Sequence, residues 1–308
     1  MANIFKKIFK SDDPEPQTSP DKVDTTPLKK STEGTPTASD QTLAGSPKRQ
    51  LELPQFTVGC GQSTGRLRDK NEDALFSLTT NIVADSTRIP VGLYIIADGM
   101  GGHQHGEIAS GVTVRTVANH IILHLYLPLL GLAGTRPADS FQEIMLAGVQ
   151  DAQRAITKDA VGGGTTLTAA FLYGDKISII HVGDSRAYLY TDQHLELLTH
   201  DHSLVKRLEE LGQITSEEAA SHPQRNVLYR ALGQGEPFEP DFNNISLPKS
   251  SILMLCSDGL WGVVNEAEII RIIQTIPDPQ QACQLLVDAA NTAGGPDNIS
   301  VIIVKVPE

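Results

Sequence analysis

Five short acidic segments constrain the fold of this chain more than any other feature of its sequence. Each places an Asp or Glu at the expected end of a strand or in a turn, and most place it beside glycine or asparagine. Glycine at such points lets the backbone turn sharply and approach a bound ion closely. The segments are Arg68–Asp73, Ala97–His103, Gly183–Arg186, Ser257–Leu260 and Gly295–Asn298. We therefore expect a fold in which strand ends far apart in sequence gather their carboxylates.

The composition changes sharply near residue 50. Residues 11–50 hold six prolines, many Ser and Thr, and no aromatic residue. Such a segment cannot bury enough apolar surface to offset the entropy lost on ordering. We predict a disordered N-terminal tail over residues 1–50 and one folded domain over residues 51–308.

The first ten residues alternate apolar and basic side chains at helical spacing. The apolar ones are Ile4, Phe5, Ile8 and Phe9, and the basic ones are Lys6, Lys7 and Lys10. This pattern predicts a short amphipathic helix with weak contact to a membrane surface. Two turns are few, and an unstructured terminus is the simpler alternative.

The overall composition excludes several protein classes. A net charge of −12 argues against a nucleic-acid-binding surface. The three cysteines, Cys60, Cys256 and Cys283, are odd in number and lack Cys-x-x-Cys spacing, so we expect neither a disulfide framework nor a thiolate zinc site. No apolar run reaches the roughly 18 residues that a membrane span needs. We expect a soluble, cytoplasmic protein.

Strand and helix patterns alternate after residue 51. The expected strands, rich in β-branched residues, are 56–60, 74–78, 92–97, 166–173, 177–182, 187–190, 251–257 and 299–306. The expected helices are 106–125, 141–158, 203–211, 265–274 and 279–292. Gly174-Asp175 lies between two apolar runs and predicts a hairpin, which favours antiparallel pairing. We predict an α+β fold, a four-layer α/β/β/α sandwich of two antiparallel sheets flanked by helices.

The acidic segments also indicate their chemistry. Asp98, Asp258 and Asp297 each adjoin a predicted strand, and any one of them alone could be a turn or cap residue. With Asp73 they form an oxygen-only ligand set, which suits Mg²⁺ or Mn²⁺ better than Zn²⁺. Two such ions, roughly 3.5–4 Å apart, can share a water and direct it at phosphorus. The set favours a metal-dependent hydrolase.

In their order along the chain, the five segments resemble the metal-dependent protein serine/threonine phosphatases of type 2C. The Asp98–His103 form, Asp-Gly-Met-Gly-Gly-His, is similar to the bacterial branch. The resemblance runs from Leu51 to Glu308 and includes Gly163–Thr166 and Arg225–Val227. It implies a catalytic domain built as a β-sandwich flanked by helices, with a binuclear metal centre at one end.

The resemblance also implies roles for particular residues. Two metals would be held by Asp73, Asp98, the carbonyl of Gly99, Asp258 and Asp297. Arg68 would bind the substrate phosphate, because a planar guanidinium grips two phosphoryl oxygens. Glu72 would order a water at the metals.

One departure concerns the proton donor. Eukaryotic members carry a histidine directly after the Asp-Gly pair, where it can protonate the leaving alkoxide, and this chain has Met100. A metal-linked water or another group must then supply the proton. His103 and His105 lie nearby in sequence, although a structural role suits a histidine there better.

A second departure concerns a third metal. Many members place an acidic residue four positions after the Asp258 equivalent, and this chain has Gly262. Asp184 remains as a ligand, with Asp201 as a candidate helper. We expect the third site to be weaker than the other two.

Residues 202–233 resemble the family's flap subdomain beside the active site. Trp261 could stack on a substrate, but core packing suits it better. Cys256 is expected to be a small core residue.

The resemblance implies a phosphatase that hydrolyses phosphoserine and phosphothreonine by attack of a water bridging two Mn²⁺ or Mg²⁺ ions. Its partners would be proteins phosphorylated by a serine/threonine kinase, in a signalling role, and we expect a monomer. Two alternatives remain open at this point. One is an inactive relative that binds phosphoproteins, against which the complete ligand set argues. The other is a hydrolase of small phosphate esters.

Overall fold

The structure, a computed structural model, describes residues 55–84, 87–101, 105–131, 140–235 and 239–308. The expected tail, residues 1–50, and the basic and apolar residues of its first ten positions lie outside the described residues. His103 also lies outside them. Within the described ranges, every helix is too short or too polar to cross a lipid bilayer.

One antiparallel sheet has the strand order β1-β12-β11-β8-β9. Its strands are β1 (Thr57–Ser63), β8 (Arg186–Thr191), β9 (His194–Leu197), β11 (Ile252–Cys256) and β12 (Ile299–Lys305). β11 and β12 are almost continuously apolar because both of their faces are buried. Cys256, at the end of β11, is fully buried, which confirms it as a core residue.

The second antiparallel sheet has the order β10-β7-β6-β3-β2. Its strands are β2 (Ala74–Ala84), β3 (Thr87–Ala97), β6 (Leu167–Tyr173), β7 (Lys176–Val182) and β10 (Asp241–Ser246). β6 and β7 form the predicted hairpin, and Gly174 has the positive φ of +61° that its tight turn needs. β3 begins five residues before the predicted strand. Pro90, in this added part, lies outside the residues 91–96 that pair with β6, so its missing N–H disrupts no bond to that strand.

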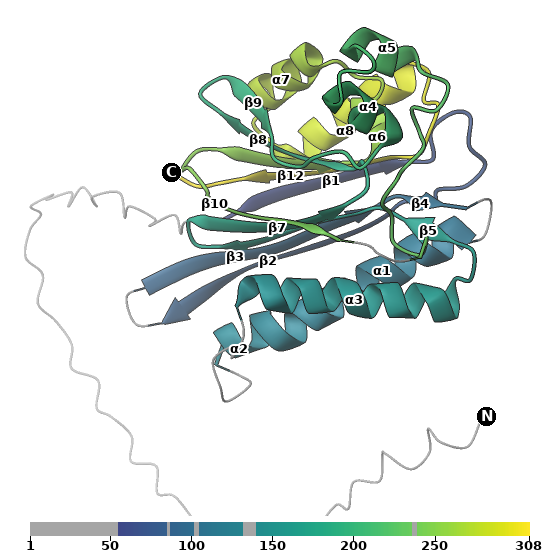
Figure 1. The fold of residues 1–308 in the computed structure, drawn as a ribbon. Helices are drawn as coiled ribbons and strands as arrows, with labels where there is room; N and C mark the ends of the chain where they lie inside the picture. The colour runs from purple at the N-terminus through teal and green to yellow at the C-terminus, as the bar shows by residue number, and fades with distance from the viewer. Residues whose placement is uncertain (1–54, 85–86, 102–104, 132–139, 236–238) are drawn as a thin grey trace, which may run out of the picture. The chain divides into compact units, whose positions relative to one another are not determined.

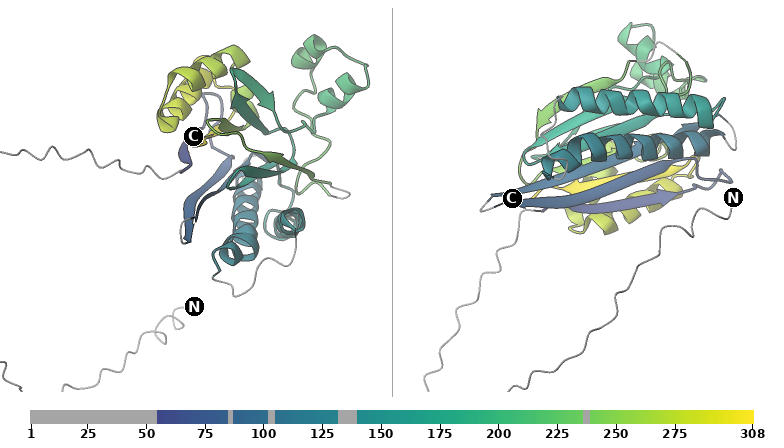
Figure 2. Two further views of the ribbon diagram at one scale, coloured as in Figure 1. Left: turned by 90° about the vertical axis from the view of Figure 1, so that its left-hand side faces the viewer. Right: turned by 90° about the horizontal axis from the view of Figure 1, so that it is seen from below.

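The two sheets pack face to face, with helices on both outer faces (Figure 1). Between the sheets lies an apolar layer that includes Tyr94, Ile96, Leu189, Leu255 and Ile302. Helices α1 (His105–Ile121) and α3 (Phe141–Asp159) run side by side over the β2–β3 sheet (Figure 2). Helices α7 (Glu266–Thr275) and α8 (Pro279–Thr292) cover the other sheet. The predicted four-layer α/β/β/α sandwich is confirmed.

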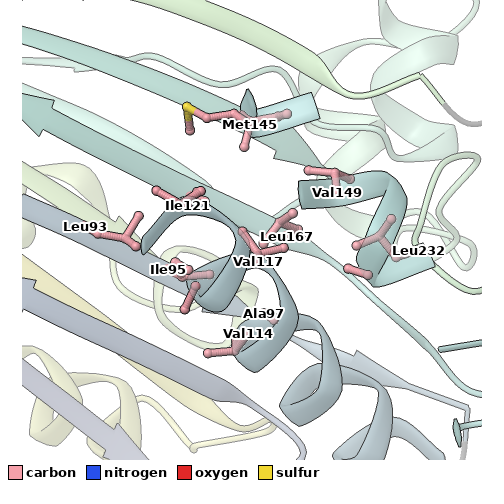
Figure 3. Packing of buried hydrophobic residues seen from close by; sticks show 14 of the residues in the cluster. Leu93, Ile95, Ala97, Val114, Val117, Ile121, Met145, Val149, Leu167 and Leu232 are labelled. Atoms are coloured by element: carbon pink, nitrogen blue, oxygen red, sulfur yellow. The ribbon is translucent and has the colours of Figure 1, made fainter. Parts of the chain in front are cut away.

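The two long helices bury the apolar faces that their sequence spacing predicts. Figure 3 shows Val117 and Ile121 of α1 and Val149 of α3 packed beside Leu93 and Ile95 of β3. These five side chains are almost completely buried. At roughly 1.5–3 kcal/mol for each buried side chain of this size, the layer is a main source of the domain's stability. A capping box between Ser140 and Glu143 fixes the start of α3.

The predicted helix 106–125 changes geometry before it ends. After α1, residues Ile122–Tyr126 form a π-helical turn, η1, and α2 (Leu127–Leu129) follows. Pro128 has no backbone N–H to donate, and the preceding Leu127 N–H closes onto the carbonyl of Ile122, five residues back.

Several short elements were not predicted. They are β4 (Gly99–Met100), β5 (Gly164–Thr165), β9, β10, α5 (Ser216–Ser221) and α6 (Asp258–Trp261). β10 is polar at most positions because it is an edge strand, and β4 and β5 are too short to show a period. The flap segment, residues 202–233, contains α4 (Leu204–Glu210) and α5. A bridge between Ser203 and Leu228 joins its two ends, and a bridge from Leu232 to Thr165 ties it to the rest of the domain.

Candidate metal centre

The five acidic segments meet at one end of the sandwich, where they surround a pocket of about 430 Å³. They arrive there because each adjoins a strand end or a connection at that edge. The pocket is lined by seven of the residues singled out from sequence: Arg68, Glu72, Asp98, Gly99, Asp184, Asp258 and Asp297. Asp73, the eighth, is buried immediately beside them at the start of β2.

Asp73 is held by hydroxyl groups from two other segments. Its Oδ2 accepts hydrogen bonds from Ser257 Oγ at 2.9 Å and from Ser300 Oγ at 2.7 Å. Its Oδ1 is buried and has no hydrogen-bond partner among the described residues. Such an oxygen is costly to bury unless something else binds it. This oxygen is therefore free to coordinate a cation.

Asp98 and Gly99 are fixed by Thr165, at the end of β5, and by the following Thr166. The Asp98 N–H donates to Thr166 Oγ1 at 2.9 Å, and the Asp98 carbonyl accepts from the Thr166 N–H at 2.9 Å. A Cβ on Gly99 would lie 2.4 Å from the Gly106 carbonyl oxygen and 2.6 Å from that of Glu72. Only glycine therefore allows the backbone to pass between these two segments into the pocket.

Asp258 begins the short helix α6, directly after β11. Like Asp73, it has a buried Oδ1 without a partner among the described residues. The next residue, Gly259, packs against the chain before β12, because a Cβ there would lie 2.0 Å from the Asn298 carbonyl oxygen. This close approach brings Asp258 and Asp297 to the same pocket.

The pKa values of the clustered carboxyl groups indicate whether the site suits a cation. Burial, reinforced by neighbouring carboxylates, raises the pKa of Asp73 to about 7 and that of Asp258 to about 6. The same causes hold the pKa values of Asp98 and Asp184 well above the usual range of a carboxyl group. Divalent cations would relieve this repulsion and bind the two orphaned oxygens. The donor set therefore fits two oxygen-preferring metal ions.

Arg68 lies at the rim of the pocket, with about half of its side chain exposed. Its Nη2 donates to Asp297 Oδ2 at 2.7 Å, and this contact raises the pKa of the guanidinium. Glu72 lines the pocket near the start of α1, and its N–H donates to Asn298 Oδ1 at 2.8 Å. The structure thus places both residues of the expected catalytic pair within the pocket lining.

Asp184, the expected third-metal residue, is 7% exposed and lines the same pocket. Asp201 has a different role from the helper suggested by sequence. Both of its carboxylate oxygens accept hydrogen bonds from Arg186, at 2.6–3.2 Å. Gly262 ends α6 on the exposed surface.

The described residues near Met100 do not provide a histidine that could act as the proton donor in its place. Gln234 Nε2 donates to the Met100 sulfur at 3.1 Å. His105 is bound through Nδ1 to the carbonyl oxygen of Val161 at 2.6 Å, and it is absent from the pocket lining. The structure therefore gives His105 a structural contact.

A second group of possible ligands does not suit a metal. Ligand atoms of His200, His202 and Asp241 lie within 4.8 Å of one another. However, the Gly183 N–H donates to His202 Nδ1, so His202 carries its proton on Nε2 and donates it to Asp241. A metal on Nε2 would have to displace that proton from a ring whose other nitrogen already accepts a hydrogen bond.

The residue that sequence reasoning missed most clearly is Asn298. Its Nδ2 donates to the carbonyls of Thr64 and Lys70 at 2.9 and 2.8 Å, and its Oδ1 accepts from Glu72. It thereby organises the loop that carries Arg68. Its position next to Asp297 was the only available signal.

Fold and pocket define a class: two-sheet α/β/β/α sandwiches with a carboxylate-rich pocket at one end. The chain matches the family model described as protein phosphatase 2C over residues 58–299. It belongs to the protein phosphatase 2C family, so the resemblance and the enzyme class expected from sequence, a phosphatase, are confirmed.

Individual relatives agree with this membership. The chain is 36% identical over 241 residues to the serine/threonine phosphatase stp of Listeria monocytogenes. The aligned region covers 78% of this chain and 92% of that protein. It is 34% identical over 226 residues to the protein phosphatase PhpP of Streptococcus pneumoniae, covering 70% and 86% of the two chains.

Solved structures extend the likeness to three dimensions. The serine/threonine phosphatase PstP/Ppp of Mycobacterium tuberculosis is 30% identical, with a TM-score of 0.68 over 82% of this chain and 100% of that one. The catalytic domain of PstP in complex with two manganese ions has a TM-score of 0.66 at 29% identity, over 82% and 99% of the chains.

Proposed function

We propose that this chain is a protein serine/threonine phosphatase that uses two Mn²⁺ or Mg²⁺ ions to hydrolyse phosphoserine and phosphothreonine. One observation carries the proposal. Four carboxylates from separate strand ends meet in or immediately beside one pocket, and two of them, Asp73 and Asp258, bury an oxygen that no described group binds. The names of the relatives and the two manganese ions of the PstP structure support it.

We assign the two ions to Asp73, Asp98, the Gly99 carbonyl, Asp258 and Asp297. When bound, the ions would lower the pKa of a water between them and direct it at the phosphorus atom. Asp184 is assigned to a third, weaker site.

The chain's own residues then have distinct tasks. Arg68 is half exposed at the rim and can hold two phosphoryl oxygens with its planar guanidinium. Glu72 accepts a hydrogen bond from the attacking water and so orients it. Met100 has no proton to give, and His105 is bound to Val161. We therefore assign the proton of the leaving alkoxide to water in the open pocket.

A groove next to the pocket favours a protein substrate over a small ester. It has a volume of about 990 Å³ and shares Arg68, Asp258 and Asp297 with the pocket. Its other walls come from the flap segment, through Val205 and Ala219, and from α6. This space is far larger than a phosphate ester needs, and it can accept the polypeptide on one side of the phosphorylated residue.

We further propose that residues 51–308 form the catalytic domain with the flap at residues 202–233. The partners would be proteins phosphorylated by a serine/threonine kinase. A monomeric state, a cytoplasmic location, a signalling role and weak membrane contact through residues 1–10 remain proposals from sequence.

The proposal is tested with purified protein on a phosphothreonine peptide and on an aryl phosphate, with Mn²⁺ and with a chelator. We expect hydrolysis of both with metal, none with chelator, and a higher kcat/KM for the peptide. Full activity in chelator would contradict the metal mechanism. Equal kcat/KM on the two substrates would favour a small-ester hydrolase.

A further inference from the structure

The turn that carries Asp184 is held by side chains from three distant parts of the chain. The Gly183 N–H donates to His202 Nδ1 at 3.1 Å, and the His202 N–H donates to the Gly183 carbonyl at 2.7 Å. The Ser185 carbonyl accepts from Thr168 Oγ1 at 3.0 Å. The Asp184 carbonyl accepts from the indole Nε1–H of Trp261 at 3.0 Å. Thr166 Oγ1, which also accepts from the Asp98 N–H, lies at hydrogen-bond distance from Ser185 Oγ, 2.7 Å, and so joins the turn to the Asp98 segment. The Trp261 contact joins the turn to the helix of Asp258.

Trp261 belongs to the same single-turn helix as Asp258. α6 spans Asp258–Trp261, so the indole lies one helical turn from a proposed ligand of the two main metals. The indole N–H thus joins the turn of Asp184 to the turn of Asp258. Sequence reasoning favoured core packing for Trp261. The structure packs it against the core beneath α7 and α8 but also places it on the wall of the groove.

Arg186 fixes the orientation of the indole ring. Its guanidinium carbon lies 3.5 Å from the centroid of the Trp261 ring, within the range of a cation–π contact. The same guanidinium forms a forked pair with Asp201, whose side chain is 6% exposed, and donates to Tyr188 Oη at 2.9 Å. The contact between Arg186 and Trp261 is therefore held in place by the ion pair of Arg186 with Asp201. Asp201 directly precedes His202, the first residue of the flap segment.

We propose that Trp261 is a positioning residue, which holds the Asp184 turn in register with the Asp258 helix and so sets the affinity of Asp184 for its cation. The inference rests on the proposed function, since it assumes that Asp184 binds a metal. It gives the single tryptophan of the chain a task that neither core packing nor substrate stacking supplies. Removing the N–H alone would leave the Asp184 carbonyl without this donor and free the turn to shift.

The first experiment is a calorimetric Mn²⁺ titration of wild type, Trp261→Phe and Asp184→Asn. Phenylalanine keeps an aromatic ring for Arg186 and removes the N–H. We expect Asp184→Asn to remove the weakest binding event and Trp261→Phe to raise its Kd about tenfold, with the tighter events unchanged. The Mn²⁺ concentration for half-maximal turnover should rise in Trp261→Phe.

Tyr190→Phe is the matched control. It removes one hydrogen-bonding atom from an aromatic residue of β8, the strand that also carries Arg186. Tyr190 Oη accepts from Gln274 Nε2 at 2.7 Å, and Tyr190 does not line the pocket. We expect its Mn²⁺ isotherm to match wild type. If Tyr190→Phe also raised the Kd of the weakest Mn²⁺-binding event, the effect of Trp261→Phe would be due to a general loosening of the fold. That result would overturn the proposal.

A second measurement requires no change at Trp261. Because the chain has one tryptophan, its emission reports on this site alone. We expect Mg²⁺ to change the emission of wild type with the midpoint of the weakest binding event, and we expect no such change in Asp184→Asn. An isotherm of Trp261→Phe identical to wild type would overturn the proposal. An Asp184→Asn isotherm identical to wild type would overturn it as well. If the protein still hydrolysed the phosphopeptide in either case, the proposed function would stand although this inference had failed.

Discussion

Arg68 and Asp297 are paired directly, with Arg68 Nη2 at 2.7 Å from Asp297 Oδ2. The proposed phosphate-binding residue and a proposed metal ligand thus share one carboxylate oxygen. A cation on Asp297 would compete with Arg68 for this oxygen and turn the guanidinium toward a phosphoryl group. The pair therefore couples metal binding to substrate binding at the rim of the pocket.

We expect Arg68→Ala to weaken substrate and inorganic phosphate binding while Mn²⁺ affinity stays close to normal or rises slightly, because Asp297 loses a competing partner. Losing a charge-assisted contact costs about 1.5–3 kcal/mol, so KM should rise about 10- to 100-fold. Arg68→Lys should restore part of the loss, since an ammonium keeps the charge without the fork. Calorimetric titrations with phosphate and with Mn²⁺ measure the predicted loss of phosphate affinity and the predicted retention of Mn²⁺ affinity. Equal phosphate affinity in wild type and Arg68→Ala would remove Arg68 from the phosphate site.

The buried carboxylates predict an unusual pH dependence for the metal-free protein. The pKa of Asp73 is raised from 3.8 to about 7, so between these values the folded state binds more protons than the unfolded state. Its contribution to stability is full below about pH 4 and is lost as the pH rises through 7. In chelator, the free energy of unfolding should fall from pH 5 to pH 7.5, and Mn²⁺ should stabilise far more at pH 7.5 than at pH 5.

Asp73→Asn isolates this effect from groups that act in the opposite direction. Burial lowers the pKa of His181 to about 4, which favours the folded state as the pH rises from 4 to 6.5. Urea unfolding of wild type and Asp73→Asn in chelator should therefore show a flatter pH profile in the variant. Parallel profiles would mean that Asp73 is ionised in the metal-free protein.

Asn298 should matter for stability as well as for turnover. Asn298→Ala removes three hydrogen bonds that tie residues 64–72 to β12, and the residue is 4% exposed. At about 1 kcal/mol for each bond, we expect a loss of about 2–4 kcal/mol in urea unfolding. Asn298→Asp should rescue little, because a carboxylate cannot donate to the two carbonyls.

The matched control for Asn298 is Asn243→Ala, which removes one exposed bond to the Leu198 carbonyl. It should change the free energy of unfolding by less than about 0.5 kcal/mol. A similar loss in both variants would contradict a special role for Asn298.

Deleting residues 1–50 should leave turnover and Tm nearly unchanged, because their composition predicts no buried contacts. A large drop in Tm would show that the segment packs on the domain. Liposome binding by the full chain, lost when Lys6, Lys7 and Lys10 are changed to Glu, would support the membrane contact.

The sequence predicted what depends on local pattern. Nearly continuous apolar runs such as β11 and β12, and the amphipathic faces of α1 and α3, can be recognised within a single segment. β10 escaped prediction because an edge strand has little to bury, and α6 because four residues show no helical period.

The acidic residues of the site were predictable because the chemistry of a carboxylate is visible in the sequence. Their partners were not. Ser257 and Ser300 reach Asp73 across 184 and 227 residues, and only the register of β12 with β1 and β11 brings them there. The commitment of Asp201 to Arg186, and of Trp261 to Asp184, likewise depends on tertiary packing.

The most direct test of the central claim is the Mn²⁺ dependence of phosphothreonine-peptide turnover in wild type and Asp258→Asn. We expect wild-type turnover to be absent in chelator and to rise to saturation with Mn²⁺. Asp258→Asn should be at least ~100-fold slower at the same Mn²⁺ concentration, a difference of about 2.7 kcal/mol in the barrier. Turnover of Asp258→Asn within about tenfold of wild type, or wild-type turnover that persists in chelator, would contradict the account.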